Sequence, residues 1–213
     1  MAYITGAVLG FLASFASFLA VEYFKKPRLI FSIDNGAIAQ RTDGVVYRIV
    51  SLRVKNTKRP SLLRAFDQTA NNARCFVAFS DPSDNHELKS VNGRWASGRE
   101  PYDYIAEKVD LGAVLIPQRE VIPPNEDGVV NVAVKFEGED HFYAFNNESY
   151  APGDDGGAWR HTKLRFGQDH LLVTVEVLTE GHRVKSRNFL LRNPNASVDN
   201  FEVSEVKKTR LPE

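Results

Sequence analysis

The sequence predicts an all-β fold, a β-sandwich of about eight to ten strands that follows one N-terminal transmembrane helix. An apolar run from Tyr3 to Val21 predicts the helix. After Pro27, short segments in which apolar and polar residues alternate are separated by turns rich in Gly and Pro, a pattern typical of sandwiches and barrels. We favour the sandwich. The expected parts are the helix with its basic stop at residues 1–27, the sandwich at 28–206 and a basic tail at 207–213.

The apolar run predicts a helix that spans a bilayer. The nineteen residues from Tyr3 to Val21 include no Asp, Glu, Lys, Arg or His, and a helix of this length measures about 28 Å, close to the thickness of the hydrocarbon core. Aromatic rings at Tyr23-Phe24 favour the head-group layer, and Pro27 ends the helix. A cleaved signal peptide is the alternative, because Ser14-Phe15-Ala16 resembles a cleavage site, but no basic residue precedes the run.

Basic residues follow the apolar run and none precedes it, which sets the expected orientation. Lys25, Lys26 and Arg28 come directly after the helix, so the positive-inside rule places the N-terminus outside and the domain in the cytoplasm. We expect these three residues to lie near lipid head groups; the alternative is that their charges only set the topology. Cys75 is the only cysteine, which agrees with a cytoplasmic domain, since secreted domains often use disulfides. An extracytoplasmic domain is the alternative.

Small residues form a stripe along the expected helix, and such stripes let a second helix approach closely. They predict a homo-oligomer or a contact with another membrane protein. The stripe consists of Gly6, Gly10, Ala13, Ser14 and Ser17.

Period-two alternation places the strands of the domain. Eleven segments are candidates, of which we expect eight to ten to form strands: Leu29 to Ile33, Val45 to Lys55, Arg74 to Ser80, Glu87 to Val91, Val109 to Ile116, Arg119 to Ile122 as an edge strand between prolines, Val130 to Glu137, His141 to Phe145, Leu171 to Val177, Val184 to Arg192 and Phe201 to Val206. In the segment after Asp127-Gly128, alternation predicts that Val134 and Phe136 point inward and that Lys135 points outward. Two long loops, at 81–107 and 146–162, interrupt the series.

The strand that begins at Val45 and the Pro-rich segment leading into Val129 to Phe136 resemble immunoglobulin-like domains. The resemblance covers about half of the domain and implies an immunoglobulin-like β-sandwich. The Cys–Trp–Cys signature of that family is absent, and the two long loops make the chain longer than the usual module.

Charge and motifs argue against several function classes. The 27 basic and 27 acidic side chains balance, so the chain lacks the net positive charge typical of nucleic-acid binding. The histidines match no zinc signature, and there is no phosphate-binding glycine loop or nucleophile elbow. We therefore expect no catalytic residue, no metal and no cofactor. A hydrolase whose residues meet only in the folded chain is the least favoured alternative. The histidines are His86, His141, His161, His170 and His182.

Aromatic and arginine residues gather in the two long loops, and this mixture is typical of protein contact sites. We predict that they bind a protein partner; the alternative is that the tryptophans fold back to cover the ends of the sandwich. The residues are Arg94, Trp95, Arg99, Tyr102, Tyr104, Tyr150, Trp159 and Arg160. The preferred function is thus a membrane-anchored adaptor or accessory subunit.

Acidic loop residues suggest a different class of function, a C2-like module that binds calcium or lipid beside a membrane. Asp81 and Asp84 lie in the first long loop and Asp154 and Asp155 in the second. Their carboxylates are suitable Ca²⁺ ligands. However, Asp and Gly are also ordinary turn residues, and neither loop has a spacing that requires a metal.

Overall fold

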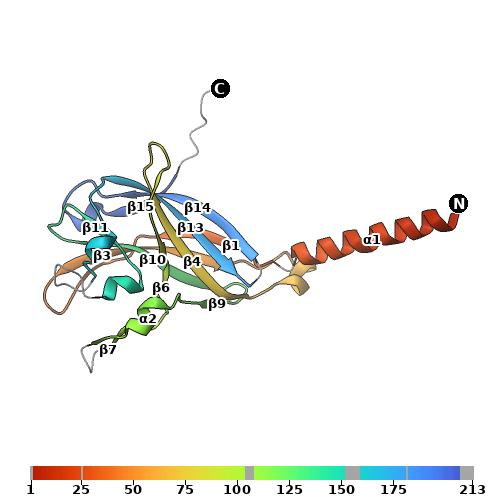
Figure 1. Cartoon of the computed structure of the whole chain (residues 1–213), viewed down its shortest axis with the longest axis horizontal. Helices are drawn as coiled ribbons and strands as arrows, with labels where there is room; N and C mark the ends of the chain where they lie inside the picture. Colours follow the sequence, from red (N-terminus) through yellow and green to blue (C-terminus); the bar gives the residue numbers. More distant parts are fainter. Residues whose placement is uncertain (1, 25, 104–107, 152–158, 181, 207–213) are drawn as a thin grey trace.

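The computed structural model describes residues 2–24, 26–103, 108–151, 159–180 and 182–206. A β-sandwich forms the body of the molecule, and the helix α1 (Ala2–Phe24) extends from one end of it (Figure 1). Two antiparallel sheets make the sandwich, which confirms the predicted all-β body. The described residues hold fifteen strands, of which eight have four residues or more, so short strands raise the total above the expected eight to ten.

The first sheet has the order β1-β3-β10-β11-β12, with β2 paired to β3 and β6 paired to β10. Its strands are β1 (Leu29–Asp34), β2 (Ile38–Gln40), β3 (Val46–Asn56), β6 (Arg94–Trp95), β10 (Asp127–Phe136), β11 (Phe142–Ala144) and β12 (Arg165–Phe166). The long strands β3 and β10 lie at its centre and pair along most of their length. Apolar side chains of both strands lie in the core between the two sheets, which explains this central position.

The second sheet has the order β15-β14-β13-β4-β5, with β9 paired to β4. Its strands are β4 (Ala70–Ser80), β5 (Glu87–Asn92), β9 (Glu120–Ile122), β13 (His170–Thr179), β14 (His182–Arg192) and β15 (Glu202–Glu205). A separate ribbon pairs β7 (Tyr102–Asp103) with β8 (Lys108–Val109). Most of the predicted strands are thus confirmed, including the edge strand between prolines.

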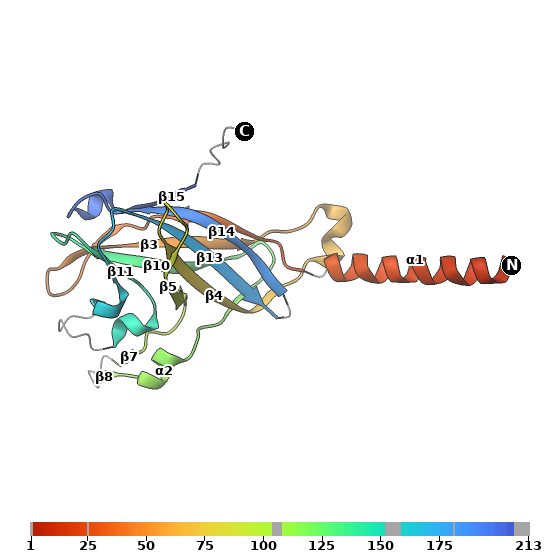
Figure 2. The same cartoon turned by 45° about the horizontal axis from the view of Figure 1, so that its top comes forward.

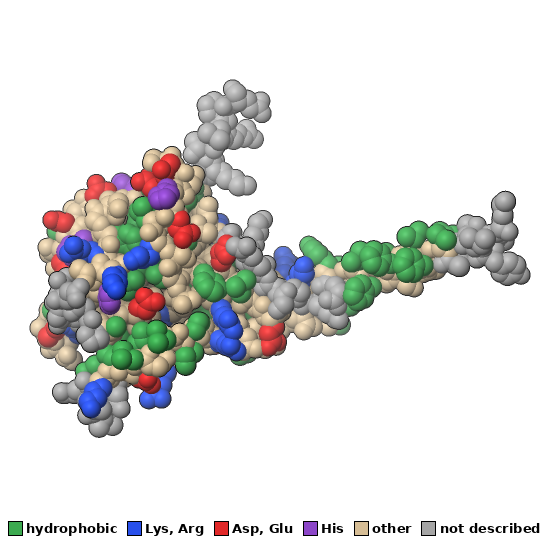
Figure 3. Space-filling view, viewed as in Figure 1, with side chains coloured by type: hydrophobic (Ala, Val, Ile, Leu, Met, Phe, Trp, Pro, Cys, Tyr) green, Lys and Arg blue, Asp and Glu red, His purple; other side chains and the backbone are tan. Residues whose placement is uncertain are grey.

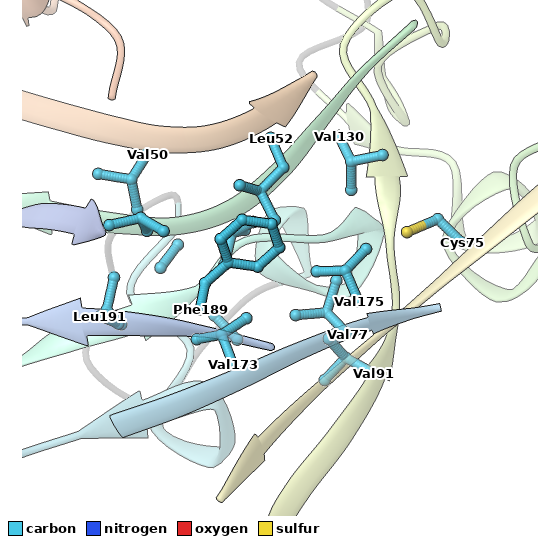
Figure 4. Close-up of a cluster of buried hydrophobic side chains, with 14 of the residues drawn as sticks. Val50, Leu52, Cys75, Val77, Val91, Val130, Val173, Val175, Phe189 and Leu191 are labelled. Carbon is cyan, nitrogen blue, oxygen red and sulfur yellow. The ribbon is translucent and has the colours of Figure 1, made fainter. Parts of the chain in front are cut away.

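The hydrophobic core lies between the two sheets. Figure 4 shows Phe189 of β14 pointing toward Leu52 of β3, with Val173 and Val175 of β13 on the same side as Phe189. These four side chains are at most 1% exposed. Burying each fully is worth about 1.5–3 kcal/mol, so the contact between the sheets is a main source of stability.

A bulge in β10 corrects the predicted orientation of its side chains. Asn131 pairs with Ser51 and Ala133 with Val50, so β10 holds one extra residue between these pairs. Such an insertion reverses which face the following side chains point to. Val134 and Phe136 therefore join a second hydrophobic cluster apart from the sandwich core, and Lys135, expected to point outward, is fully buried.

The prediction of a strand from Val109 to Ile116 is wrong. Only Lys108–Val109 is a strand, and a short helix, α2 (Leu111–Leu115), follows. Asp110 is the N-cap of α2, because its side chain accepts a hydrogen bond from the Ala113 N–H at 3.2 Å. Capping of this kind begins a helix where alternation alone would favour a strand. Both views place α2 to the side of the sandwich, away from α1 (Figures 1 and 2).

Helix α1 has 23 residues, and it meets the domain after a short connection. The carbonyl of Arg28 accepts hydrogen bonds from the N–H and the hydroxyl of Thr57 at 2.8 and 3.1 Å, which fixes the end of the connection to the sandwich. A short 3₁₀ helix, η1 (Ser61–Phe66), lies beside the last turn of α1. Among the residues that the structure describes, no helix combines the length and the apolar character that a membrane crossing needs.

Candidate interaction surface

The face of α2 is the candidate site, because it presents large aliphatic side chains to solvent. Leu111, Leu115 and Ile116 are 62%, 78% and 66% exposed, and we call these three residues the α2 surface. Figure 3 shows hydrophobic side chains gathered on the same side of the body as α2. Apolar patches on a soluble surface often mark sites where another molecule binds.

Two polar contacts hold α2 in this position. Asp110 caps its N-terminus, and the side-chain N–H of Asn147 donates to the Ala113 carbonyl at 3.1 Å. Asn147 begins the 3₁₀ helix η2 (Asn147–Tyr150), so α2 leans on the second long loop. The α2 surface therefore belongs to a fixed element. Sequence reasoning missed it, because the run from Leu111 to Ile116 was assigned to a strand; Asp110 before an apolar run was the signal for a helix.

Trp95 and Arg94, predicted to bind a partner, lie in the interior. Trp95 is 0% exposed, and its indole N–H donates to the Ala73 carbonyl at 3.0 Å. The guanidinium of Arg94 donates to the carbonyls of Trp95 and Gly98 at 3.3 and 3.0 Å, and its side chain is also buried. These two buried residues present no surface to a partner, and Trp95 belongs to the core between the sheets.

Trp159 covers the second hydrophobic cluster. Its ring lies edge-on to Tyr47 and Phe145, with centroids 5.2 Å apart in each case, and to Tyr150 at 5.9 Å. The hydroxyl of Tyr150 donates to a Glu100 carboxylate oxygen at 3.1 Å. Trp159 is half-buried, so its main contacts are within the domain.

The remaining predicted contact residues are dispersed. Tyr102 is half-buried and packs against the second cluster. Arg99 is exposed, and its backbone carbonyl accepts a hydrogen bond from Gln118 at 3.2 Å. Tyr104 lies outside the described residues. The structure therefore does not join the predicted aromatic and arginine residues into one exposed surface.

Arg160 belongs to a polar cluster at the edge of the second hydrophobic cluster. Its Nε donates to Glu139 at 2.7 Å, and its guanidinium carbon lies 3.8 Å from the centroid of the Phe136 ring. His141 Nε2 lies 3.1 Å from Glu139 and 2.8 Å from the Tyr143 hydroxyl. Burial, with a smaller contribution from the Glu139 charge, raises the pKa of Tyr143 to about 12. This cluster ties residue 160 to the turn after β10.

The residues predicted for the membrane lie within α1 or directly after it in the sequence. Lys26 and Arg28 are exposed directly after the helix, whereas Lys25 lies outside the described residues. In the small-residue stripe, Gly10, Ala13, Ser14 and Ser17 are exposed. A Cβ placed on Gly10 would meet no atom within 4 Å, so the stripe has open space around it. Gly6 lies within α1, but its surroundings are outside the described part.

The acidic residues considered for calcium make local turn contacts. Asp81 accepts hydrogen bonds from the Ser83 N–H and hydroxyl at 2.8 and 2.5 Å, which lowers the pKa of its carboxyl group. Asp84 accepts one from the His86 N–H at 2.8 Å. Asp154 and Asp155 lie outside the described residues. Within the described part of the chain, no group of three or more His, Cys, Asp or Glu side chains is placed to hold a metal ion.

Cys75 is a core residue, as expected. Its side chain is 2% exposed, and burial raises the pKa of the thiol. A neutral, buried thiol is a poor nucleophile.

The chain matches no family model, no curated protein and no solved structure.

Proposed function

We propose that the chain is a membrane-anchored adaptor or accessory subunit, in which α1 anchors the sandwich and the α2 surface binds a protein partner. The observation that carries the partner role is the exposure of Leu111 and Leu115 on one short helix and of Ile116 directly after it. Exposing such side chains to water is unfavourable by about 25 cal/mol per Å² of apolar area. A partner that covered them would recover this free energy.

The anchor role rests on the whole of α1, including residues 2–7, whose side chains lie outside the described part. A helix of 23 residues measures about 34 Å, enough for the roughly 30 Å of a hydrocarbon core. No charged side chain occurs from Tyr3 to Val21. Phe11, Leu12, Phe15 and Phe18 project from the helix and are more than half exposed, as lipid-facing side chains would be.

The orientation follows from the basic residues after α1. Lys25, Lys26 and Arg28 favour a cytoplasmic domain by the positive-inside rule. The open stripe around Gly10 suits a second helix, so we include a homo-oligomer or another membrane protein among the lateral contacts. The two facing antiparallel sheets support an immunoglobulin-like arrangement of the sandwich, which is likewise part of the proposal.

Alkaline extraction and protease treatment test the anchor. We expect the full chain to stay in the membrane pellet at high pH, because a spanning helix is not held by charge. Protease added to sealed cells should leave the domain intact, and protease added after permeabilisation should digest it. Release at high pH would overturn the anchor, and digestion in sealed cells would overturn the orientation.

Site-directed photocrosslinking tests the partner role. A photoreactive residue in place of Leu115 should crosslink in native membranes to one protein species, and Leu111→Ser in the same chain should reduce the product. The matched control is the same photoreactive residue in place of Leu88, which is 40% exposed on β5. Equal products from positions 115 and 88, or a product that Leu111→Ser leaves unchanged, would overturn the α2 surface as the binding site.

A further inference from the structure

The short helix η1 is fixed against the end of α1. The rings of Phe66 and Phe24 lie 5.6 Å apart, and Arg59 donates to the carbonyls of Phe24 and Lys26 at 2.6 and 2.8 Å. Figures 1 and 2 both show η1, in amber, beside the domain end of the red helix α1. A bilayer that contains α1 therefore has its surface close to η1.

Leu62 of η1 projects into solvent. It is 93% exposed, the highest value among the exposed large hydrophobic residues of the described chain, and none of the residues of η1 is buried. The sandwich gains no packing from this side chain. At the border of a membrane the same side chain would enter the acyl layer, where its exposure to water ends.

Basic side chains surround η1 in the sequence and at the end of α1. Lys58 and Arg64 flank Leu62 and are exposed, as are Lys26 and Arg28. Figure 3 shows Lys and Arg side chains where α1 meets the body. Asp67 is the only acidic residue between Lys55 and Ala70, and its carboxylate accepts the Arg59 N–H at 2.8 Å. In the segment between Lys55 and Ala70, three basic residues thus outnumber one acidic residue, and this excess of positive charge suits a contact with anionic lipid.

We propose that η1 is a second membrane contact, which binds the surface of an anionic bilayer. Leu62 enters the acyl layer, and Lys58, Arg64, Lys26 and Arg28 bind the phosphates of anionic phospholipids. The inference rests on the proposed function, because α1 brings η1 to the bilayer. It goes beyond anchoring, since η1 selects for lipid charge and holds the sandwich at a fixed tilt, while α1 alone would insert into any bilayer.

A fluorescent probe at position 62 tests this contact. Cys75 is 2% exposed, so in Leu62→Cys an environment-sensitive maleimide labels the new cysteine selectively. The full chain is reconstituted into vesicles of phosphatidylcholine alone or with phosphatidylserine. Acrylamide measures access of water to the probe, because a neutral quencher is not repelled by anionic lipid. The matched control is Leu115→Cys, which is 78% exposed on the distant α2.

We expect quenching at position 62 to fall several-fold with phosphatidylserine and to change little with phosphatidylcholine alone, while position 115 stays accessible in both. Adding Lys58→Glu and Arg64→Glu should restore quenching, since each basic residue near an anionic surface changes the bound population by about fivefold. Unchanged melting of these variants in detergent shows that the fold is intact.

Flotation of the vesicles separates the two proposals. If the chain floats with both lipids but position 62 stays accessible, or is protected equally by both, the η1 contact is overturned and the anchor stands. If the chain floats with neither lipid, the anchor fails and the η1 contact falls with it.

Discussion

The guanidinium of Arg59 lies over the ring of Phe24, with its central carbon 5.4 Å from the ring centroid, and donates to the Phe24 carbonyl at 2.6 Å. The last carbonyls of a helix lack partners within the helix and carry partial negative charge. The Arg59 cation of the sandwich thus supplies a hydrogen-bond donor to the C-terminal end of α1. Arg59 also donates to the carbonyls of Lys26 and, at 3.4 Å, Phe66, so one side chain joins α1, the connection and η1.

Replacing Arg59 by Ala should free α1 from the domain without unfolding the sandwich. Hydrogen bonds from a charged donor contribute about 1.5–3 kcal/mol, so we expect the connection to open at least about tenfold more often. Trypsin cleavage after Arg28, which Leu29 follows, should accelerate accordingly when it is measured in detergent. Arg64→Ala removes an exposed arginine of η1 and is the control. If cleavage is equally fast in both variants, Arg59 does not hold the connection.

Trp95→Ala should destabilise the sandwich strongly. The substitution removes a fully buried ring and its hydrogen bond to Ala73, and such changes typically cost about 3–5 kcal/mol. Thermal unfolding should show the loss as a large drop in melting temperature. A nearly unchanged melting temperature would instead show that Trp95 lies at a contact surface and not in the core.

A double-mutant cycle identifies the space that Trp95 fills. A Cβ on Gly128 would lie 2.9 Å from the Trp95 ring carbon Cζ3, which is too close for any real contact. Gly128→Ala alone should therefore cost about 1–3 kcal/mol from overpacking. In combination with Trp95→Phe, which shortens the ring system, the cost of Gly128→Ala should be smaller. Additive costs would show that the two residues do not compete for this space.

Lys135 should make the free energy of unfolding rise with pH at alkaline pH. Its ammonium group donates to the Glu139 carbonyl at 2.7 Å and to the Asn193 side chain, and burial lowers its pKa below the ordinary 10.5. Between the lowered pKa and 10.5, the unfolded chain binds more protons than the folded chain. The free energy of unfolding therefore increases with pH in this window, by about 1.4 kcal/mol for every unit by which the pKa is lowered.

The variant Lys135→Met isolates this contribution. We expect the difference in unfolding free energy between the original chain and the variant to rise with pH toward 10.5. Tyr143 acts in the opposite sense, because its raised pKa means that stability is lost above about pH 10, where unfolded tyrosine ionises. Tyr143 is present in both proteins, so its contribution cancels in the difference. A difference that stays flat with pH would show that the pKa of Lys135 is ordinary.

Alternation of apolar and polar residues was enough to place most strands, because successive side chains of a strand point to opposite faces of the sheet and only one face is buried. It could not place the bulge in β10, since Val132, Ala133 and Val134 are all apolar and fit either face. Lys135 was therefore assigned to the wrong side. Its burial depends on Asn193, which lies 58 residues away in the sequence and becomes a partner only in the folded chain.

The candidate site was predictable only in part. Turn residues surround Trp95 in the sequence, as in a loop. Its burial depends on Gly128, which leaves room for the ring and lies in a strand far away in the sequence. The run from Leu111 to Ile116 is apolar throughout, so periodicity does not separate a strand from a helix there. Asp110 before this run was the available signal. The Asp110 side chain caps the helix through one hydrogen bond, from the Ala113 N–H, and this bond is recognised only once the local geometry is known.

The final prediction concerns this cap. Asp110→Ala should fray α2, because losing an N-cap costs about 1 kcal/mol and α2 has only five residues to share the loss. Hydrogen exchange of the Ala113 amide, which donates to Asp110, should accelerate about fivefold. Crosslinking from position 115 should weaken, while the melting temperature of the sandwich stays nearly the same. Asp110→Asn keeps a capping oxygen and should restore both measurements. If exchange at Ala113 is unchanged in Asp110→Ala, the contact from Asn147 alone fixes α2, and the cap does not set the α2 surface.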